Sequence, residues 1–445
     1  MKFDGRWLVV FLVVISSVIS TGTCVSISIT GGNSATINGA DSTQGVSTPD
    51  GTTIMATGSI RAALDNAIPG ATISLLPKTY YEIVQVPISL NIIGAGSGST
   101  IVDGQQLGSV FIIPSGVTVG LADMTIQNGM TQSGGGIYNA GTLTVKGCKI
   151  TGNTAYNDGG GVCNYGTATV TGSTISGNLA YYNGGGICNE DVATVIVTDS
   201  TISGNANWED GSGIWNGGTA TVTDSTISGN TAYRGDGGGF YNQGDIVPGL
   251  ATISDSTISG NFAYYGGGIC NVGIATVTSS TIYGNTAYYD GGGVCNYGTA
   301  TVTGSTISGN TAERNGGGFF NSGTGAELSL SNSLITGNTA YSDGGGIYNT
   351  NGGSYNPNSN SSLVVGETTQ ITNNQATTGY GGGIYSDAGS VTFDGKNVGV
   401  KYNKAHLPAT GSSWYQGWGV YLTSEVPITK NGFYSATQVT GNVNV

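Results

Sequence analysis

Apolar and polar residues alternate in short runs along most of the chain, and the runs return about every 25 residues. In the second copy, small polar residues separate Ala168, Val170 and Ile175, and Gly172 interrupts the alternation. Strict alternation over short runs predicts β-strands, whereas the apolar residues of a helix recur at a spacing of about 3.6. The pattern therefore predicts short strands joined by tight turns, with no regular helix inside the repeat.

Glycine triplets mark the start of each repeat unit. Ten triplets or close copies occur at spacings of 25 to 37 residues, beginning at Gly134, Gly159, Gly184, Gly211, Gly237, Gly266, Gly291, Gly316, Gly344 and Gly381. A repeat of this length is typical of a solenoid, whose units bury their apolar side chains against their neighbours. Each unit has room for three strand-like runs, and each run can pair only with the equivalent run of the next unit. The paired strands are then parallel, and connections between parallel strands of one sheet are right-handed. We expect an all-β right-handed parallel β-helix (solenoid) of about 25-residue coils with a short N-terminal capping helix.

Two sets of asparagines occupy fixed places in this repeat. One set, from Asn153 to Asn338, closes each run of the form I-x-G-N, and the other, from Asn139 to Asn349, lies five residues after the first glycine of a triplet. Stacked coils turn each set into a ladder of side-chain amides, and asparagine also tolerates left-handed turns. We interpret both sets as structural corners. The glycine triplets lack the helix and lysine of a phosphate-binding loop, so we assign them to turns and close packing.

The two ends of the chain depart from the repeat. Lys2 and Arg6 precede an apolar run and then small residues, which is the layout of a secretory signal peptide; a retained N-terminal anchor is the alternative. The resulting division is a signal peptide (1–23), a lead-in segment (24–57), an N-terminal cap with degenerate coils (58–130), regular β-helix repeats (131–389), and C-terminal coils with a cap (390–445).

A short helix is expected after the lead-in segment. Ser59 is a suitable N-cap, and Ile60, Leu64 and Ala67 share one helical face before the helix ends at Pro69-Gly70. Such a helix would cover the open end of the first coil and prevent edge-to-edge association.

Charge narrows the choice of partners. The chain carries 12 basic and 25 acidic residues, for a net charge of −13. A negative chain is a poor ligand for nucleic acid or anionic lipid. We expect a mature protein without a membrane span, secreted or displayed at the cell surface or outer envelope. Its expected partners are a glycan or a cell-surface protein, with end-to-end self-association through the open coils as a further expectation.

The repeat resembles that of pectin-lyase-like β-helix surface proteins, and most closely the polymorphic outer-membrane protein repeat, which pairs a GGA-[ILV] motif with an F-x-x-N motif. Residues 134–137 (GGGI) match the first motif with glycine in place of alanine, and residues 175–178 (ISGN) match the second with isoleucine in place of phenylalanine. The resemblance covers roughly residues 58–390. It implies a parallel β-helix, but this fold hosts adhesins, structural proteins and polysaccharide-degrading enzymes alike.

Three carboxylates are the candidates for catalysis. Asp199, Asp224 and Asp255 hold the same place in successive coils, which would bring neighbours to about 5 Å, close enough to perturb one another or to share calcium. Glycine, serine or asparagine fills this place in other coils, which favours a solvent-exposed turn. We therefore assign no catalytic residue, no metal and no cofactor, and no further ligand supports calcium.

Aromatic residues gather just before the glycine triplets, often beside an aspartate. On an exposed corner they would suit sugar rings or another protein, and the alternative is that they shield and stiffen the corner. The binding candidates are Tyr156, Tyr182, Trp208, Tyr233, Tyr265, Tyr289 and Tyr341. Arg234-Gly235-Asp236 on the same corner spells an integrin-recognition tripeptide, which we interpret as one variant of this loop.

Cysteines form two pairs in the repeat. Cys163 and Cys188 share one register position in adjacent coils, as do Cys270 and Cys295. The distance between stacked strands suits a disulfide but the parallel side chains do not, so bridges and free thiols both stay open. Zinc is not expected, since neither a histidine nor a C-x-x-C motif accompanies the cysteines.

These observations favour a secreted or surface-displayed β-helix with an adhesin-like or envelope structural role, which binds glycan or protein along its repeat faces. The alternative is a polysaccharide lyase or glycoside hydrolase of the pectin-lyase-like superfamily. An enzyme gathers nonrepeating polar residues over two or three coils, whereas this chain spreads equivalent residues along its length. The sequence thus favours binding over catalysis.

Overall fold

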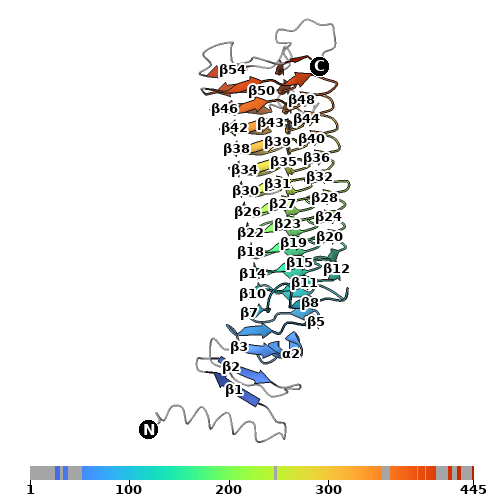
Figure 1. Cartoon of the computed structure of the whole chain (residues 1–445), viewed down its shortest axis with the longest axis vertical. Coiled ribbons are helices and arrows are strands. Elements are labelled where there is room, and N and C mark those ends of the chain that lie inside the picture. The colour runs from blue at the N-terminus through green and yellow to red at the C-terminus, as the bar shows by residue number, and fades with distance from the viewer. Residues whose placement is uncertain are drawn as a thin grey trace, which may run out of the picture.

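The protein is an elongated parallel β-solenoid in the computed structural model (Figure 1). The structure describes residues 26–30, 34–38, 53–244, 248–351, 361–387, 389–395, 397–406, 419–422, 428–431 and 443–444. The expected signal peptide lies outside the described residues. Within the described ranges, the structure has no helix that is both long and apolar enough to cross a membrane.

Each regular coil contributes one strand to each of four parallel stacks. In the coil that begins at Thr167 these are β18 (Thr167–Thr171), β19 (Thr174–Ser176), β20 (Leu179–Ala180) and β21 (Ile187–Asn189). We call the four stacks the long-strand, middle, two-residue and post-glycine sheets. The long-strand sheet runs from β3 (Thr53–Ala56) to β54 (Ile428–Asn431), and the middle sheet runs from β5 (Thr79–Tyr81) to β51 (Gly399–Lys401). The two-residue sheet runs from β12 (Met130–Thr131) to β55 (Val443–Asn444), and the post-glycine sheet runs from β6 (Val84–Gln85) to β53 (Val420–Leu422).

The all-β parallel solenoid is confirmed, but the expected number of strands per coil is wrong. The sequence predicts three strand-like runs, and the structure has four strands, because β20 and its equivalents form a separate sheet. A strand of two residues is too short to show an alternating pattern. The two-residue sheet nevertheless decides the shape of the corner, because the aromatic loops follow directly from it.

Isoleucines and other aliphatic residues form one continuous core along the axis. The central residue of each middle-sheet strand points inward, so that Ile175, Ile202 and Ile227 are each fully buried in register with one another. Full burial of such a side chain contributes roughly 1.5–3 kcal/mol. Each coil therefore depends on its neighbours to exclude water from its apolar residues.

Both asparagine sets form the expected ladders. In the first, Asn205 donates from Nδ2 to Oδ1 of Asn230 at 3.0 Å, and Asn230 donates to Asn261 at 3.0 Å. In the second, Asn189 donates to Asn216 and Asn216 to Asn242, both at 2.8 Å. All six amides are buried, so each ladder both satisfies the amides and joins coil to coil.

A third ladder, of serine hydroxyl groups, was not expected from the sequence. Ser200 accepts a hydrogen bond at Oγ from the backbone N–H of Ser173 at 3.1 Å, and Ser225 accepts in the same way from Ser200 at 3.1 Å. Each hydroxyl donates in turn to a carbonyl of its own coil, as Ser225 does to Thr223 at 2.7 Å. The recurring serine before Thr-Ile is the signal that could have identified it.

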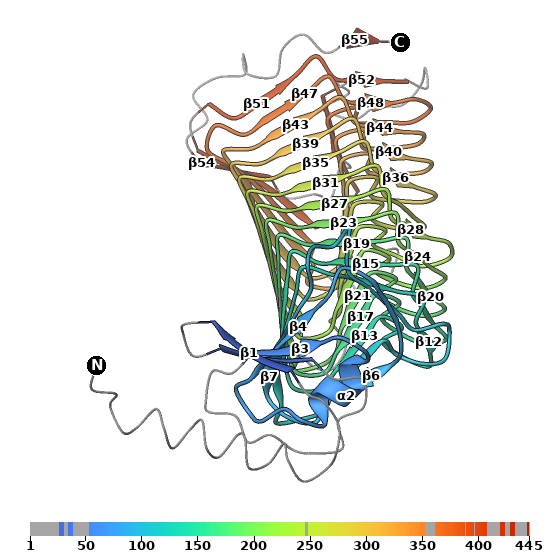
Figure 2. The same cartoon turned by 60° about the horizontal axis from the view of Figure 1, so that its bottom comes forward.

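The capping helix is present but shorter than expected. It is α2 (Ile60–Leu64), and Ser59 is its N-cap, accepting at Oγ from the N–H of Ala62 at 3.3 Å. Glu82 accepts from the N–H of Ile60 at 2.7 Å, which favours a helix start at this point. The helix ends at Leu64 rather than at Pro69-Gly70, and it packs against β3 and β4 (Thr72–Leu75) at the N-terminal end of the stack (Figure 2). An antiparallel hairpin of β1 (Ser26–Thr30) and β2 (Ser34–Asn38) lies beside β3.

Candidate functional site

The corner loops that follow the two-residue sheet project in a row from one side of the solenoid (Figure 2). The first residue after a two-residue strand is aromatic in seven coils, and we call these residues the outer aromatic column: Tyr156, Tyr181, Trp208, Tyr233, Tyr264, Tyr288 and Tyr341. Backbone hydrogen bonds set its register, as when the N–H of Tyr181 donates to the carbonyl of Ala155 at 3.0 Å.

The seven predicted binding residues do not form one column. Tyr156, Trp208, Tyr233 and Tyr341 belong to the outer aromatic column, whereas Tyr182 and Tyr289 lie one residue further along the loop. Tyr265 packs beside this second pair of residues, because its ring centroid is 5.2 Å from that of Tyr289. The loop between the two-residue strand and the glycine triplet differs in length from coil to coil. Aromatic residues at the same distance before a triplet therefore belong to different columns in different coils.

Rings of the outer aromatic column contact one another in pairs. The ring centroids of Tyr156 and Tyr181 are 5.8 Å apart, and those of Trp208 and Tyr233 are 5.2 Å apart. Trp208 and Tyr341 are 39% and 57% exposed. The column is therefore an exposed surface whose side chains are already restrained, and restraint lowers the entropy lost on binding.

The neighbouring aspartates support the loops instead of extending this surface. Asp158 accepts at Oδ1 from the N–H of Asn183 at 3.0 Å, and Asp290 accepts from the N–H of Asn315 at 2.9 Å. Each carboxylate thus holds the corner loop of the next coil. Burial raises the pKa of Asp158 above its ordinary value.

The Arg-Gly-Asp tripeptide follows the same plan. Arg234 is exposed and lies over the ring of Trp208, 5.5 Å from its centroid. Asp236 is partly buried, and its N–H donates to Oδ1 of Asp210 at 2.8 Å. Burial, and then the charge of Asp210, raise the pKa of Asp236 to about 7. The aspartate is therefore part of the loop packing.

The three stacked carboxylates lie on exposed left-handed turns. Asp199, Asp224 and Asp255 have φ of 50°, 48° and 50°, and they follow strands of the long-strand sheet in successive coils. Gly172 and Ser279 hold the same place with φ of 55° and 49°. This conformation accounts for the exchange of aspartate, glycine, serine and asparagine at this position.

A groove opens on the outer side of the post-glycine sheet, toward its C-terminal end. Its volume is about 490 Å³, and its lining includes Tyr265, Asp290, Tyr297, Arg314, Phe320 and Tyr348. The rings of Phe320, Tyr348, Tyr385 and Tyr421 stack through four coils, with centroid separations of 5.5, 4.8 and 5.2 Å. Their interplanar angles are 13°, 9° and 7°, so the stack is nearly parallel.

Arg314 supplies a fixed positive charge to this groove. Its Nε donates to Oδ1 of Asp290 at 2.8 Å, and the two residues form the single ion pair among the described residues. Asp290 is fully buried while the Arg314 side chain is 48% exposed. Arg314 also lies over the ring of Tyr289, 5.4 Å from its centroid. The hydrogen bonds that Arg314 donates to Asp290 raise the pKa of Arg314, so the guanidinium stays charged.

Sequence reasoning missed this groove. The repeat pattern gave no role to Arg314, or to Phe320 and Tyr348, which hold the register position of the cysteines in their own coils. The recurrence of aromatic residues at that position in four successive coils was the available signal.

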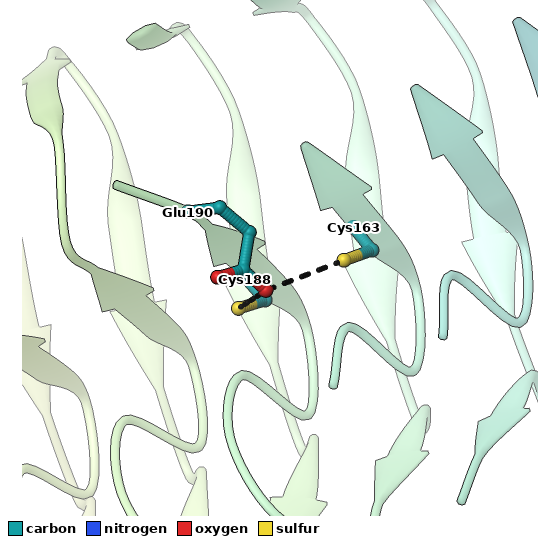
Figure 3. Close-up of side chains that lie close together, drawn as sticks. All are labelled: Cys163, Cys188 and Glu190. Atoms are coloured by element: carbon teal, nitrogen blue, oxygen red, sulfur yellow. Dashed lines mark hydrogen bonds between the residues drawn. The ribbon is translucent and has the colours of Figure 1, made fainter. Parts of the chain in front are cut away.

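The cysteines are free, buried thiols among the described residues, so the structure favours thiols over bridges. Cys163 pairs in register with Cys188, and Cys270 with Cys295, as the repeat predicts. Glu190 lies beside the first pair: Cys188 donates from Sγ to its Oε1 at 3.4 Å, and Cys163 does so at 3.8 Å (Figure 3). Burial, and then the neighbouring Cys163, raise the pKa of Cys188.

Comparison with known families identifies the architecture. Residues 108–287 match the family described as the right handed beta helix region. Residues 332–350 and 368–387 match the repeat of the Chlamydia polymorphic membrane proteins. The protein is thus a right-handed parallel β-helix, and two of its segments match the polymorphic membrane protein repeat, as the motif resemblance predicts. No curated protein sequence matches the chain significantly.

The chain also has a low overall similarity to several solved structures. The A-module of mannuronan C-5 epimerase AlgE6 from Azotobacter vinelandii is 16% identical, with 87% of this chain and 94% of that chain covered and a TM-score of 0.36. The periplasmic alginate epimerase AlgG is 10% identical, with 89% and 85% covered and a TM-score of 0.43. A pectate lyase is 13% identical, with 80% of each chain covered and a TM-score of 0.33. Likeness at this level carries no argument about activity.

Proposed function

We propose that this protein is a surface-displayed, adhesin-like β-helix that binds glycan chains. The groove beside Arg314 carries the proposal, and the outer aromatic column extends the binding surface along the solenoid. The polymorphic membrane protein repeats support display at the cell surface, since the family that shares them is named for membrane proteins.

The composition of the groove suits a sugar unit. Its volume of about 490 Å³ lies in the range of ligand pockets, roughly 300–1,000 Å³. Tyr297, Phe320 and Tyr348 give it an aromatic wall, and the lining also contains the polar residues Asn315 and Asp387. Sugars present both C–H surfaces and hydroxyl groups, so they match a wall of this kind.

Arg314 defines which glycans the groove prefers. Its guanidinium is held by buried Asp290 yet remains partly exposed, so it can bind an anionic group without first being ordered. A carboxylate or sulfate on an acidic glycan is the fitting partner for a planar guanidinium. We therefore expect acidic glycans to bind more tightly than neutral ones.

Binding to a panel of neutral and acidic polysaccharides, measured by calorimetry with chain length followed by mass, tests the proposal. Thr324→Trp places a bulky ring at an exposed residue of the groove lining, and binding should weaken at least about tenfold. Thr252→Trp is the matched control, on the exposed face of β30 (Leu250–Ser254) in the long-strand sheet.

Each other outcome speaks against the proposal. If Thr324→Trp binds the glycan as tightly as the wild type does, the glycan binds outside the groove. A panel without any binder would favour a protein partner. Shortened polysaccharide chains would establish the lyase or hydrolase alternative instead.

A further inference from the structure

A pair of thiols and a carboxylate converge on the outer side of the post-glycine sheet, away from the groove. Cys163 on β17 (Val162–Asn164) lies opposite Cys188 on β21. Both side chains are buried, and they form a small cluster with Trp215 that is separate from the main core. Strand pairing therefore fixes two sulfur atoms side by side before any ligand binds.

The third group, the carboxylate of Glu190, takes the place of a tyrosine in a coil that is two residues longer than the preceding one. Two additional residues follow Asn189 relative to the preceding coil, and the N–H of Glu190 donates to the carbonyl of Asn164 at 2.9 Å. One coil earlier, the N–H of Tyr165 donates to Asn139 in the same way. Glu190 thus replaces a tyrosine, and its carboxylate turns toward both sulfurs (Figure 3).

The distances suit a tetrahedral metal ion. Oε1 of Glu190 lies 3.4 Å from Sγ of Cys188 and 3.8 Å from Sγ of Cys163. Zinc binds sulfur at about 2.3 Å and carboxylate oxygen at about 2.0–2.2 Å, so tetrahedral angles place these donors about 3.5 Å apart. The three donor atoms all lie within 4.8 Å of one another, in the one such group among the described residues.

The electrostatic surroundings favour a cation here. Glu190 is only partly exposed and takes part in no ion pair, because the single pair among the described residues joins Arg314 to Asp290. Zinc would displace the two thiol protons, and its double positive charge would then largely offset the charges of the two thiolates and the carboxylate. Thiolates select zinc over the hard ions calcium and magnesium.

We propose that Cys163, Cys188 and Glu190 form a zinc site, with both sulfurs and one carboxylate oxygen as ligands and a water molecule in the fourth position. Histidine and C-x-x-C spacing are the usual sequence signs of a zinc site, and neither accompanies these cysteines. In a solenoid, two cysteines 25 residues apart become neighbours through the register instead.

The chain contains its own control. Cys270 on β33 (Ile269–Asn271) and Cys295 on β37 (Val294–Asn296) form an equally buried, in-register pair. The residues two positions after these cysteines are Val272 and Tyr297, so this pair has no carboxylate at the place of Glu190. A thiol pair by itself offers only two ligands, so we expect it to bind zinc weakly.

Zinc binding by the reduced, chelator-treated protein tests the site. We expect one zinc per chain by elemental analysis after dialysis, with affinity measured against a chromophoric chelator. Glu190→Gln should lower the affinity at least about tenfold, the scale seen for loss of even an indirect metal contact. Cobalt should give thiolate-to-metal absorption in the wild type and in Cys270→Ser, and none in Cys163→Ser.

Two results would overturn the proposal. One is unchanged zinc affinity in Glu190→Gln, whose partly exposed side chain can be replaced with the fold intact, as circular dichroism would verify. The other is loss of zinc in Cys270→Ser with retention in Cys163→Ser. Because the glutamine variant preserves both cysteines, the test remains decisive even if a cysteine variant fails to fold.

Discussion

Inside the solenoid, successive coils repeat the same residue: Ile202 stacks on Ile175, and Asn205 on Asn178. On the outer corner the equivalent residues change from Tyr181 to Trp208 and then, further along, to Glu313. Side chains that point inward must fill a core of constant cross-section and complete the hydrogen bonds of the same buried polar groups in every coil. Few residue types meet both requirements. Outward side chains meet solvent and are free to diverge, which makes the corner and the post-glycine groove the places where binding specificity can reside.

Removing one amide from the ladder should have the largest effect on stability. Asn230→Ala deprives Asn205 of its acceptor and leaves the carbonyl of Ile202 without its amide donor. Each buried group without a partner costs about 1–3 kcal/mol, so the free energy of unfolding should fall by at least about 3 kcal/mol. Urea denaturation measures this, and a loss below about 1 kcal/mol would contradict the structural role of the ladder.

Protonation of Asp236 should give the next largest effect. Its pKa is about 7 in the folded protein and near 3.9 in the unfolded chain. Because the pKa is higher in the folded protein, Asp236 contributes its full stabilisation of the fold below about pH 4. This contribution is lost as the pH rises to about 7. Between pH 5 and pH 7 the wild type should lose on the order of 2 kcal/mol more than Asp236→Asn. Parallel stability curves for the two proteins would contradict the prediction.

A single methylene in the core should matter less. Ile227→Val removes one buried carbon from a residue that is fully buried between Ile202 and Ile258. The expected loss is about 0.5–1.5 kcal/mol in urea denaturation. Replacing an exposed residue of the outer aromatic column, as in Tyr156→Ser, serves as the control and should change stability by less than about 0.5 kcal/mol.

Replacement of a turn carboxylate by glycine should give the smallest effect, whereas a branched residue at the same position should not be tolerated as well. Asp224 has a φ of 48°, a conformation in which glycine is unstrained, so Asp224→Gly should leave stability within about 0.5 kcal/mol. Asp224→Val should lose about 1–2 kcal/mol because a branched side chain is strained there. Thermal midpoints of the two variants measure the difference, and equal midpoints would show that backbone conformation does not govern this position.

The sequence by itself determined the repeat, the parallel β-solenoid, both asparagine ladders, the cysteine register and the N-cap Ser59. These features depend on periodicity and local backbone preference, which the linear pattern carries directly. Once units of equal length stack, equivalent residues must meet, so contacts between residues 25 positions apart could be predicted without coordinates.

Only the tertiary structure decided what departs from the repeat. The two-residue sheet is too short to be recognised in sequence, and corner loops of unequal length divide the tyrosines between two columns. Glu190 reaches the thiols at the place that a tyrosine holds one coil earlier, and the fold turns Asp158 and Asp290 toward the next coil while it leaves Arg314 at the groove. Such placements depend on the path of the backbone around each irregular coil, and side-chain direction follows that path rather than the residue type.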